Sequence, residues 1–174
     1  MSTTRTIQPD LAVVGAPVVT MNRSGPASTI GCLLISDDKQ HRKILERVAC
    51  TEGWNLDACV TVLEAMKLVF RKKYELAFVD IQSVAGSSMQ NDYQGLAGDL
   101  SRDHVPLLIV NGVPEDPIGE ITARQIGVWV YLPGFDGKTE LDVLFREARL
   151  ALKRLTRQPS STGVIEVTAS KPHQ

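Results

Sequence analysis

Several features that often identify a protein class are missing from this chain. Its 174 residues contain three cysteines with no CxxC spacing, which argues against a disulfide framework or a zinc site and favours small buried apolar roles. No apolar run approaches the roughly 18 residues of a membrane helix, so we expect no membrane span. The formal net charge is −1, which gives no electrostatic reason to expect nucleic-acid binding.

Both ends of the chain differ in composition from its middle. Residues 1–28 are rich in Ser, Thr, Pro and Gly, and residues 157–174 are similar. Such segments bury too little apolar surface to fold, so we expect a disordered leader and a flexible tail around one domain at residues 29–156. The leader's apolar stretch is broken by polar residues and proline and lies far from Cys32, so we expect no signal peptide and a cytoplasmic protein.

Short apolar runs alternate with amphipathic stretches through the middle of the chain. The runs have the length of buried parallel strands; they lie at 31–36, 55–60, 76–80, 106–111 and 128–132. The amphipathic stretches predict helices; they lie near 44–52, 62–73, 90–101, 116–125 and 141–155. This alternation predicts an α/β fold with a parallel sheet and helices on both faces.

Acidic residues close two of these predicted strands. Asp37 and Asp38 follow the first strand, and Asp80 ends the third. The carboxyl ends of neighbouring parallel strands meet in one crevice. Three carboxylates there would repel one another unless a hard cation lay between them, so we expect Mg²⁺, with the Gln82 backbone carbonyl as a further ligand. Helix capping is the other interpretation of the acidic pair, and we expect one of the two to cap.

Asp80 is the candidate nucleophile of this pocket, because a carboxylate can attack a phosphoryl group and form an aspartyl phosphate. Phosphoryl transfer also needs a hydroxyl and a cation nearby. The fourth strand instead ends in Asn111, and the fifth is followed by Pro133 and Gly134. Lys138, a few residues later, is the remaining candidate cation.

The order of these motifs resembles the receiver domain of two-component response regulators over roughly residues 30–156. The acidic pair and Asp80 match the family's metal ligands and phosphoacceptor, and 64–66 (Glu-Ala-Met) matches a common helical motif. Residues 127–132 resemble the segment into strand five, with Tyr131 at the family's aromatic switch position. The resemblance implies a flavodoxin-like, doubly wound (βα)5 fold with strand order 2-1-3-4-5.

The chain departs from the family pattern at two positions that respond to phosphate. Asn111 stands where the family has Thr or Ser, and either Gly134 or Pro133 stands where it has Lys. Three interpretations remain open. The first is an atypical receiver that acts through protein–protein interaction, and the second is a working receiver phosphorylated on Asp80 by a histidine kinase. The third is an unrelated flavodoxin-like enzyme or nucleotide binder, which the lack of GxGxxG and P-loop sequences disfavours.

A lone receiver would act by docking to a protein, either a histidine kinase or a downstream signalling protein, and would not be an enzyme beyond phosphoryl transfer to itself. We expect the docking surface on the fourth helix, the fifth strand and the fifth helix, where Trp129, Tyr131 and Phe135 would cluster. Core packing of Trp129 is the alternative. A homodimer through the same face is a candidate arrangement, because like-to-like pairing is the common symmetric solution.

Overall fold

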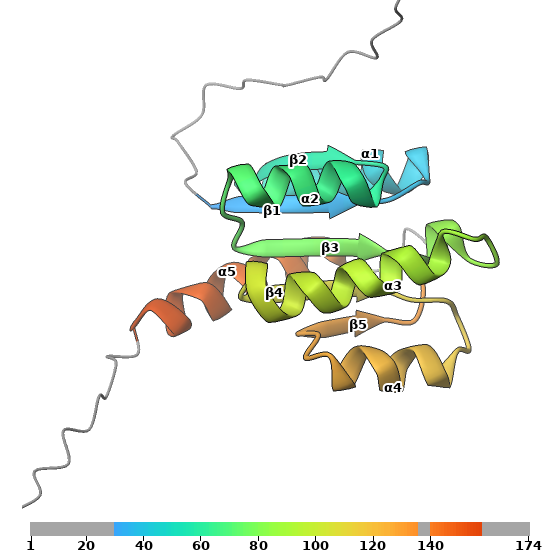
Figure 1. Cartoon of the computed structure of the whole chain (residues 1–174). Coiled ribbons are helices and arrows are strands. Elements are labelled where there is room, and N and C mark those ends of the chain that lie inside the picture. Colours follow the sequence, from blue (N-terminus) through green and yellow to red (C-terminus); the bar gives the residue numbers. More distant parts are fainter. Residues whose placement is uncertain (1–29, 136–139, 158–174) are drawn as a thin grey trace, which may run out of the picture.

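The computed structural model describes residues 30–135 and 140–157. A five-stranded, fully parallel sheet has the order β2-β1-β3-β4-β5, which confirms the predicted topology (Figure 1). The strands are β1 (Gly31–Ile35), β2 (Asn55–Cys59), β3 (Leu76–Asp80), β4 (Leu107–Asn111) and β5 (Val130–Leu132). The predicted leader and tail and Lys138 lie outside the described residues, apart from the last helical residue at 157.

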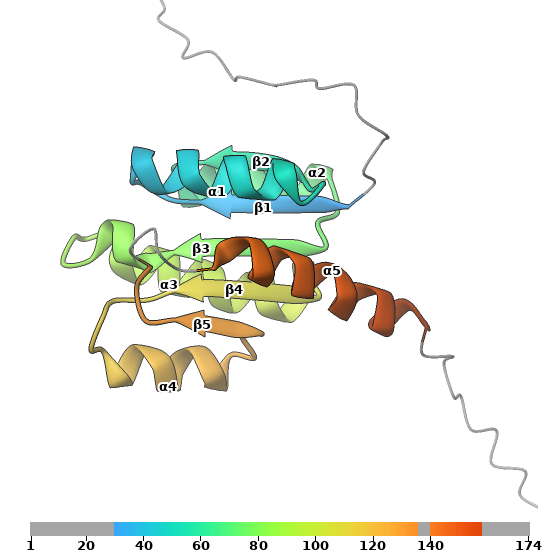
Figure 2. The same ribbon diagram turned by 180° about the vertical axis from the view of Figure 1, so that it is seen from behind.

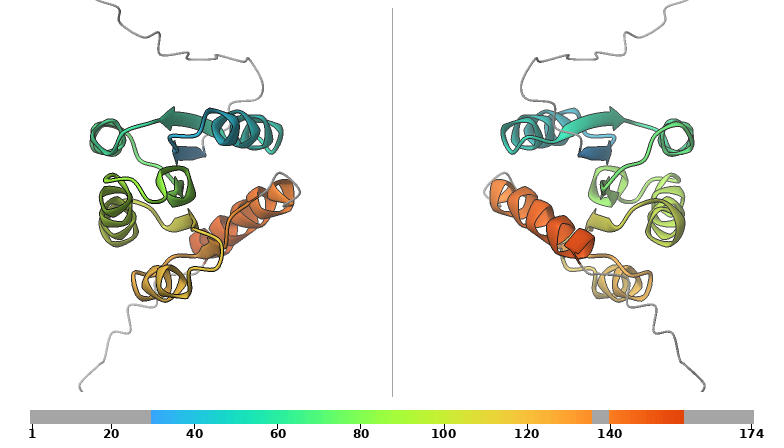
Figure 3. Two further views of the ribbon diagram at one scale, coloured as in Figure 1. Left: turned by 90° about the vertical axis from the view of Figure 1, so that its right-hand side faces the viewer. Right: turned by 90° about the vertical axis from the view of Figure 1, so that its left-hand side faces the viewer.

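Helices cover both faces of the sheet. They are α1 (Lys39–Thr51), α2 (Val62–Arg71), α3 (Gln90–Asp99), α4 (Pro117–Gln125) and α5 (Leu141–Arg157). Figure 2 shows α1 and α5 lying over one face. Figure 3 shows α2, α3 and α4 on the other. In the described part of the chain, no helix combines the length and apolar character that crossing a bilayer requires.

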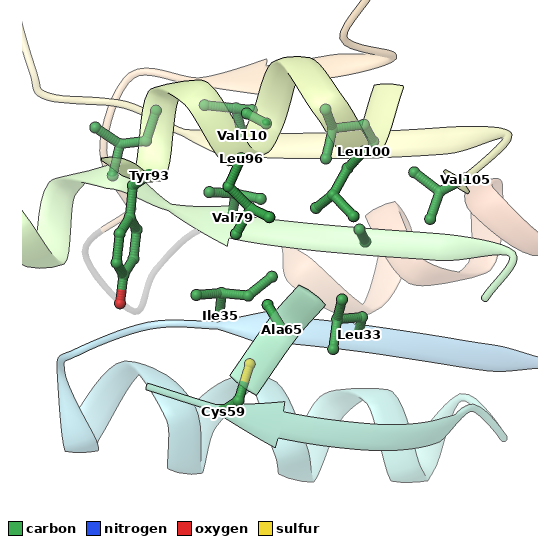
Figure 4. Packing of buried hydrophobic residues seen from close by; sticks show 14 of the residues in the cluster. Leu33, Ile35, Cys59, Ala65, Val79, Tyr93, Leu96, Leu100, Val105 and Val110 are labelled. Carbon is green, nitrogen blue, oxygen red and sulfur yellow. The ribbon is translucent and has the colours of Figure 1, made fainter. Parts of the chain in front are cut away.

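Alternation along each strand builds two separate apolar cores. In β1, Leu33 and Ile35 pack with the α2 and α3 layer, whereas Cys32 and Leu34 pack with the α1 and α5 layer. Figure 4 shows the first of these cores, where the strand side chains meet the inner face of α3. Successive side chains of a strand point to opposite faces, so a strand covered on both sides is apolar throughout.

Capping fixes where the first two helices begin. The Asp38 carboxylate accepts hydrogen bonds from the amides of Gln40 and His41, over 2.6 and 3.0 Å, which confirms that one aspartate of the pair caps α1. Thr61 and Glu64 form a capping box at the start of α2. The start of α1 is therefore held directly beside the carboxyl end of β1.

Local details differ from the expected elements in three places. β5 begins at Val130, two residues later than predicted. A short 3₁₀ helix (Ile81–Val84) follows β3 directly, and a π-helical turn (Leu100–His104) continues α3. The 3₁₀ turn tightens the chain and the π turn widens it, and both lie where the chain turns back toward the sheet.

The cysteines play two different roles. Cys32 and Cys59 are buried, and burial raises the pKa of the Cys59 thiol to about 12, so it behaves as an apolar core residue. Cys50 is exposed on α1, which contradicts the expected buried role for this one cysteine. The apolar face of α1 passes through Leu45 and Ala49, and Cys50 lies outside it.

Candidate functional site

Asp80 lies at the carboxyl end of β3, at the edge of the sheet where the sequence predicts a crevice. It pairs in register with Asn111 of β4, and both residues are completely buried. Parallel strands bring their carboxyl ends together, which is why these two polar side chains meet.

Three donors hold both oxygens of the Asp80 carboxylate. The Ser36 hydroxyl donates to Oδ2 over 2.6 Å, and His41 Nδ1 lies 2.8 Å from the same oxygen. The Asn111 amide nitrogen donates to Oδ1 over 2.7 Å. Burying a carboxylate is costly unless its oxygens are hydrogen-bonded, so these contacts are what allow Asp80 to lie in the core.

His41 reaches Asp80 from the first turn of α1, which the Asp38 cap holds in place. Its ring packs against Phe135, with 4.3 Å between ring centroids. A proton must lie between Nδ1 and the carboxylate oxygen, because two lone pairs at 2.8 Å would repel each other. His41 therefore places a hydrogen-bond donor beside Asp80, where the sequence analysis expected a metal ion.

Asn111 joins the end of β4 to the loop after β3. Its amide nitrogen donates both to Asp80 and to the Gln82 side-chain oxygen, the latter over 3.0 Å. This pair of acceptors fixes the orientation of the amide, because a flipped group would face them with its own oxygen. The Asn111 Oδ1 atom is buried and has no hydrogen-bond partner among the described residues.

The two aspartates of the acidic pair have different environments. The Asp38 carboxylate is used as the helix cap, and the hydrogen bond from the His41 amide, followed by that from Gln40, holds the pKa of Asp38 below its usual value. Asp37 is exposed, and its amide donates over 3.0 Å to the Ser83 hydroxyl. That hydroxyl in turn donates to the Asp80 backbone carbonyl over 2.7 Å, which ties the two loops together.

Three of the four predicted magnesium ligands are engaged in other hydrogen bonds. Asp38 is committed to its cap, Asp80 to its three donors, and the Gln82 carbonyl accepts the Ala85 amide within the 3₁₀ turn. Across residues 30–135 and 140–157, no group of three or more His, Cys, Asp or Glu side chains is placed to hold a metal ion. The three donors occupy most of the acceptor positions of the Asp80 carboxylate, so Mg²⁺ would have to compete with them, and the magnesium site stays a prediction.

Two residues of this site were missed by sequence reasoning. Ser36 is the polar residue that follows a fully apolar strand, and His41 lies one helical turn before Ile44 and Leu45 on the inner face of α1. Extending that helical stripe backwards by one turn would have placed His41 toward the sheet.

The three aromatic residues expected to form a docking surface are separated. Phe135 is 3% exposed and lies between His41 and Phe78 in the α1 and α5 core, where Trp129 also packs. Tyr131 packs with the opposite core. The expected surface cluster is therefore wrong, because alternation in β5 sends Tyr131 to the other face and the following turn carries Phe135 inward.

Tyr131 lies beside a small cavity of about 20 Å³ formed with residues of β4 and α4. Its hydroxyl is buried without a partner among the described residues, and burial raises its pKa. A cavity of this size holds one water molecule.

No family model and no curated protein sequence matches this chain. Solved structures of receiver domains share its fold. A CheY-like receiver domain protein from Methanospirillum hungatei JF-1 is 14% identical, with 72% of this chain and 98% of that chain covered and a TM-score of 0.57. A response regulator from Clostridium difficile is 19% identical, with coverage of 72% and 98% and a TM-score of 0.58.

A third similar structure is a response regulator protein from Burkholderia pseudomallei, described with a phosphorylated aspartic acid, a calcium ion and citrate. It is 21% identical, covers 75% of each chain and has a TM-score of 0.54. These likenesses confirm the receiver fold that the sequence motifs predict. At such identities they establish the fold alone.

Proposed function

We propose that this chain is an atypical receiver module that works in signal transduction by binding another protein, and that its phosphorylation pocket is incomplete. The observation that supports this role is the buried Asp80 carboxylate, 0% exposed, with both oxygens held by Ser36, His41 and Asn111. A phosphoacceptor must present a free lone pair to the phosphorus atom, and here three donors already occupy most of the acceptor positions of the carboxylate.

The turn after β5 supports the same conclusion. The family's lysine would stand at Gly134 or Pro133, and neither side chain carries charge. Gly134 has φ +79°, and a Cβ there would lie 2.7 Å from Pro114 Cγ. A lysine at Gly134 would therefore require both a strained backbone and a shift of Pro114.

Asn111 replaces the family's hydroxyl residue after β4, and Gly134 or Pro133 replaces its lysine after β5. A phosphate on Asp80 would therefore have weak means to favour one conformation over another. The module would then bind its partner in a constant state, and the partner would be a signalling protein of the cytoplasm. We propose no enzymatic activity for it.

A working receiver is the second candidate. It is favoured by the position of Asp80 at the carboxyl end of β3 and by the phosphorylated aspartic acid of the Burkholderia pseudomallei protein. In that case a histidine kinase would be the partner. An Asp80 oxygen would attack the phosphorus of a phosphohistidine, the P–N bond would break, and the histidine would leave with the electron pair. If the attacking atom is Oδ2, Ser36 and His41 would first have to release it.

The test is phosphorylation of the full chain by acetyl phosphate, with and without added Mg²⁺, followed by intact mass spectrometry. We expect no stable gain of a phosphoryl group in either condition. A gain that disappears in Asp80→Asn but persists in the control Asp142→Asn, at an exposed aspartate of α5, would overturn the incomplete pocket and favour the working receiver.

A further inference from the structure

The largest exposed apolar side chains of α2 lie on one side of the helix. Leu63 is 65% exposed and Phe70 is 76% exposed, and seven residues separate them, so they share one helix face. Met66 lies between them, and Met89, 37% exposed, stands across from Leu63 at the start of α3. Single exposed hydrophobic residues are ordinary, but a connected set indicates a contact surface.

Beside this stripe runs a groove between α2 and α3, with a volume of about 600 Å³. Leu63 and Met66 line one side, and residues of α3 line the other. The groove is hollow partly because α3 has Gly95 at this point, where an added Cβ would meet nothing within 4 Å. Figure 3 shows α2 and α3 in the same outer layer, with no described element over them.

Charges of opposite sign flank the apolar surface. Asp92 and Asp99 line the α3 side; Asp99 is paired with Arg102 over 2.6 Å, whereas Asp92 makes no ion pair within the described residues. On α2, Lys67 and Arg71 are exposed. The apolar groove therefore has acidic residues on its α3 side and basic residues on its α2 side.

We propose that this surface binds the same surface of a second copy of the chain, with the two α2 helices antiparallel and each lying along the other's groove. A surface that carries both signs of charge around an apolar stripe is complementary to itself after a twofold rotation. In that arrangement Leu63 of one copy packs near Phe70 of the other, and Lys67 approaches Asp92 across the interface. Met66 and Met89 fill the remaining space, since methionine adapts to irregular gaps.

This inference deepens the proposed interaction role by naming one partner, and it moves the expected dimer from the β5 side to the α2 side. The interface does not involve Asp80 or its donors. A failure of the dimer would therefore leave the phosphorylation test unaffected, and the reverse also holds.

The first experiment measures the mass of the full chain in solution by light scattering and sedimentation over a range of concentrations, with circular dichroism to confirm folding. We expect a dimer for the unmodified chain and a monomer for Leu63→Asp. The matched control is Ile118→Asp on α4, which alters an aliphatic side chain at least as exposed as Leu63 (75% against 65%) and should leave the dimer intact.

A second pair of variants changes the groove without adding charge. Gly95→Leu places a side chain in the hollow and should yield a monomer, whereas Gly95→Ala makes the same backbone change without filling it and should stay dimeric. Because Gly95 is exposed and helical, both substitutions favour the helix, so neither should unfold the chain.

A charge exchange tests the antiparallel geometry. Lys67→Glu and Asp92→Lys should each weaken dimerisation by about tenfold, and the double variant should recover it, because the pair is then restored with its signs reversed. The proposal is wrong if the unmodified chain is a monomer at every concentration. It is equally wrong if Leu63→Asp and Gly95→Leu remain dimeric, if the double variant does not recover, or if Leu63 mediates capture of a different protein by a monomeric chain.

Discussion

The Asp80 site, at the carboxyl ends of the strands, and the α2–α3 surface differ in whether their polar and apolar groups have partners within the chain. At the first, a buried carboxylate meets hydroxyl, imidazole and amide donors within 2.8 Å, so little capacity remains for an outside ligand. At the second, large apolar side chains face solvent, together with the Asp92 carboxylate, which has no ion pair in the described part of the chain. Binding capacity follows unsatisfied groups, so the comparison favours a protein that recognises partners through its helical surface.

Among the variants that test this comparison, His41→Ala is expected to have the largest effect on stability. It removes a donor from buried Asp80 and the contact with Phe135, and we expect the free energy of unfolding to fall by about 2 kcal/mol. Urea denaturation with an unchanged m-value measures this loss. The control is Gln40→Ala, one residue earlier on the exposed side of α1, which should change stability by less than about 0.5 kcal/mol. Equal effects from the two would mean that the contact with Asp80 contributes nothing to stability.

Buried Tyr93 and half-buried Tyr131 allow the same comparison with a smaller expected effect. The Tyr93 hydroxyl donates to the Val60 carbonyl, whereas the Tyr131 hydroxyl has no partner within the described residues. We expect Tyr93→Phe to cost about 1 kcal/mol and Tyr131→Phe to cost nothing or to stabilise the chain. Thermal unfolding of both variants decides this. A larger loss from Tyr131→Phe would show that its hydroxyl has a partner.

The smallest expected effect is the pH dependence of the Asp38 cap. Its pKa is lower in the folded chain than in the unfolded chain, so its charge stabilises the fold above the unfolded pKa and that stabilisation is lost as pH falls through the folded pKa. Asparagine caps as well but does not titrate. Between pH 7 and about pH 3, the unmodified chain should therefore lose more stability than Asp38→Asn. Parallel pH profiles of the two would rule out this contribution.

Most of the fold could be predicted from the sequence, because its signals are local. The alternation of strand-length apolar runs with helical stripes predicted all five strands and all five helices. The resemblance carried by the order of the motifs predicted the order of the strands in the sheet. β5 was the least accurate strand, since Val128 and Trp129 extend its apolar run but precede the strand, although the Trp129 amide already donates to the Leu108 carbonyl of β4.

The sequence predicted the edge of the sheet where the site lies, but not the groups that surround Asp80. The rule that parallel strands end at one edge correctly placed Asp80 and Asn111 together, because both lie inside regular strands. It could not say which way Asp37 and Asp38 point, since they lie in a loop where capping of α1 competes with pocket formation. His41 was missed because its role depends on the depth at which α1 begins, and that is set by three-dimensional packing.

The most direct test of the central claim is the sign of the stability change in Asp80→Asn, measured by urea denaturation near pH 7. If Asp80 is held by internal donors, the amide places its own N–H groups against some of them, and the free energy of unfolding falls by about 2 kcal/mol or more. If Asp80 instead belongs to a self-repelling acidic pocket, removing its charge relieves the repulsion and stabilises the chain. A rise in stability would therefore contradict the account.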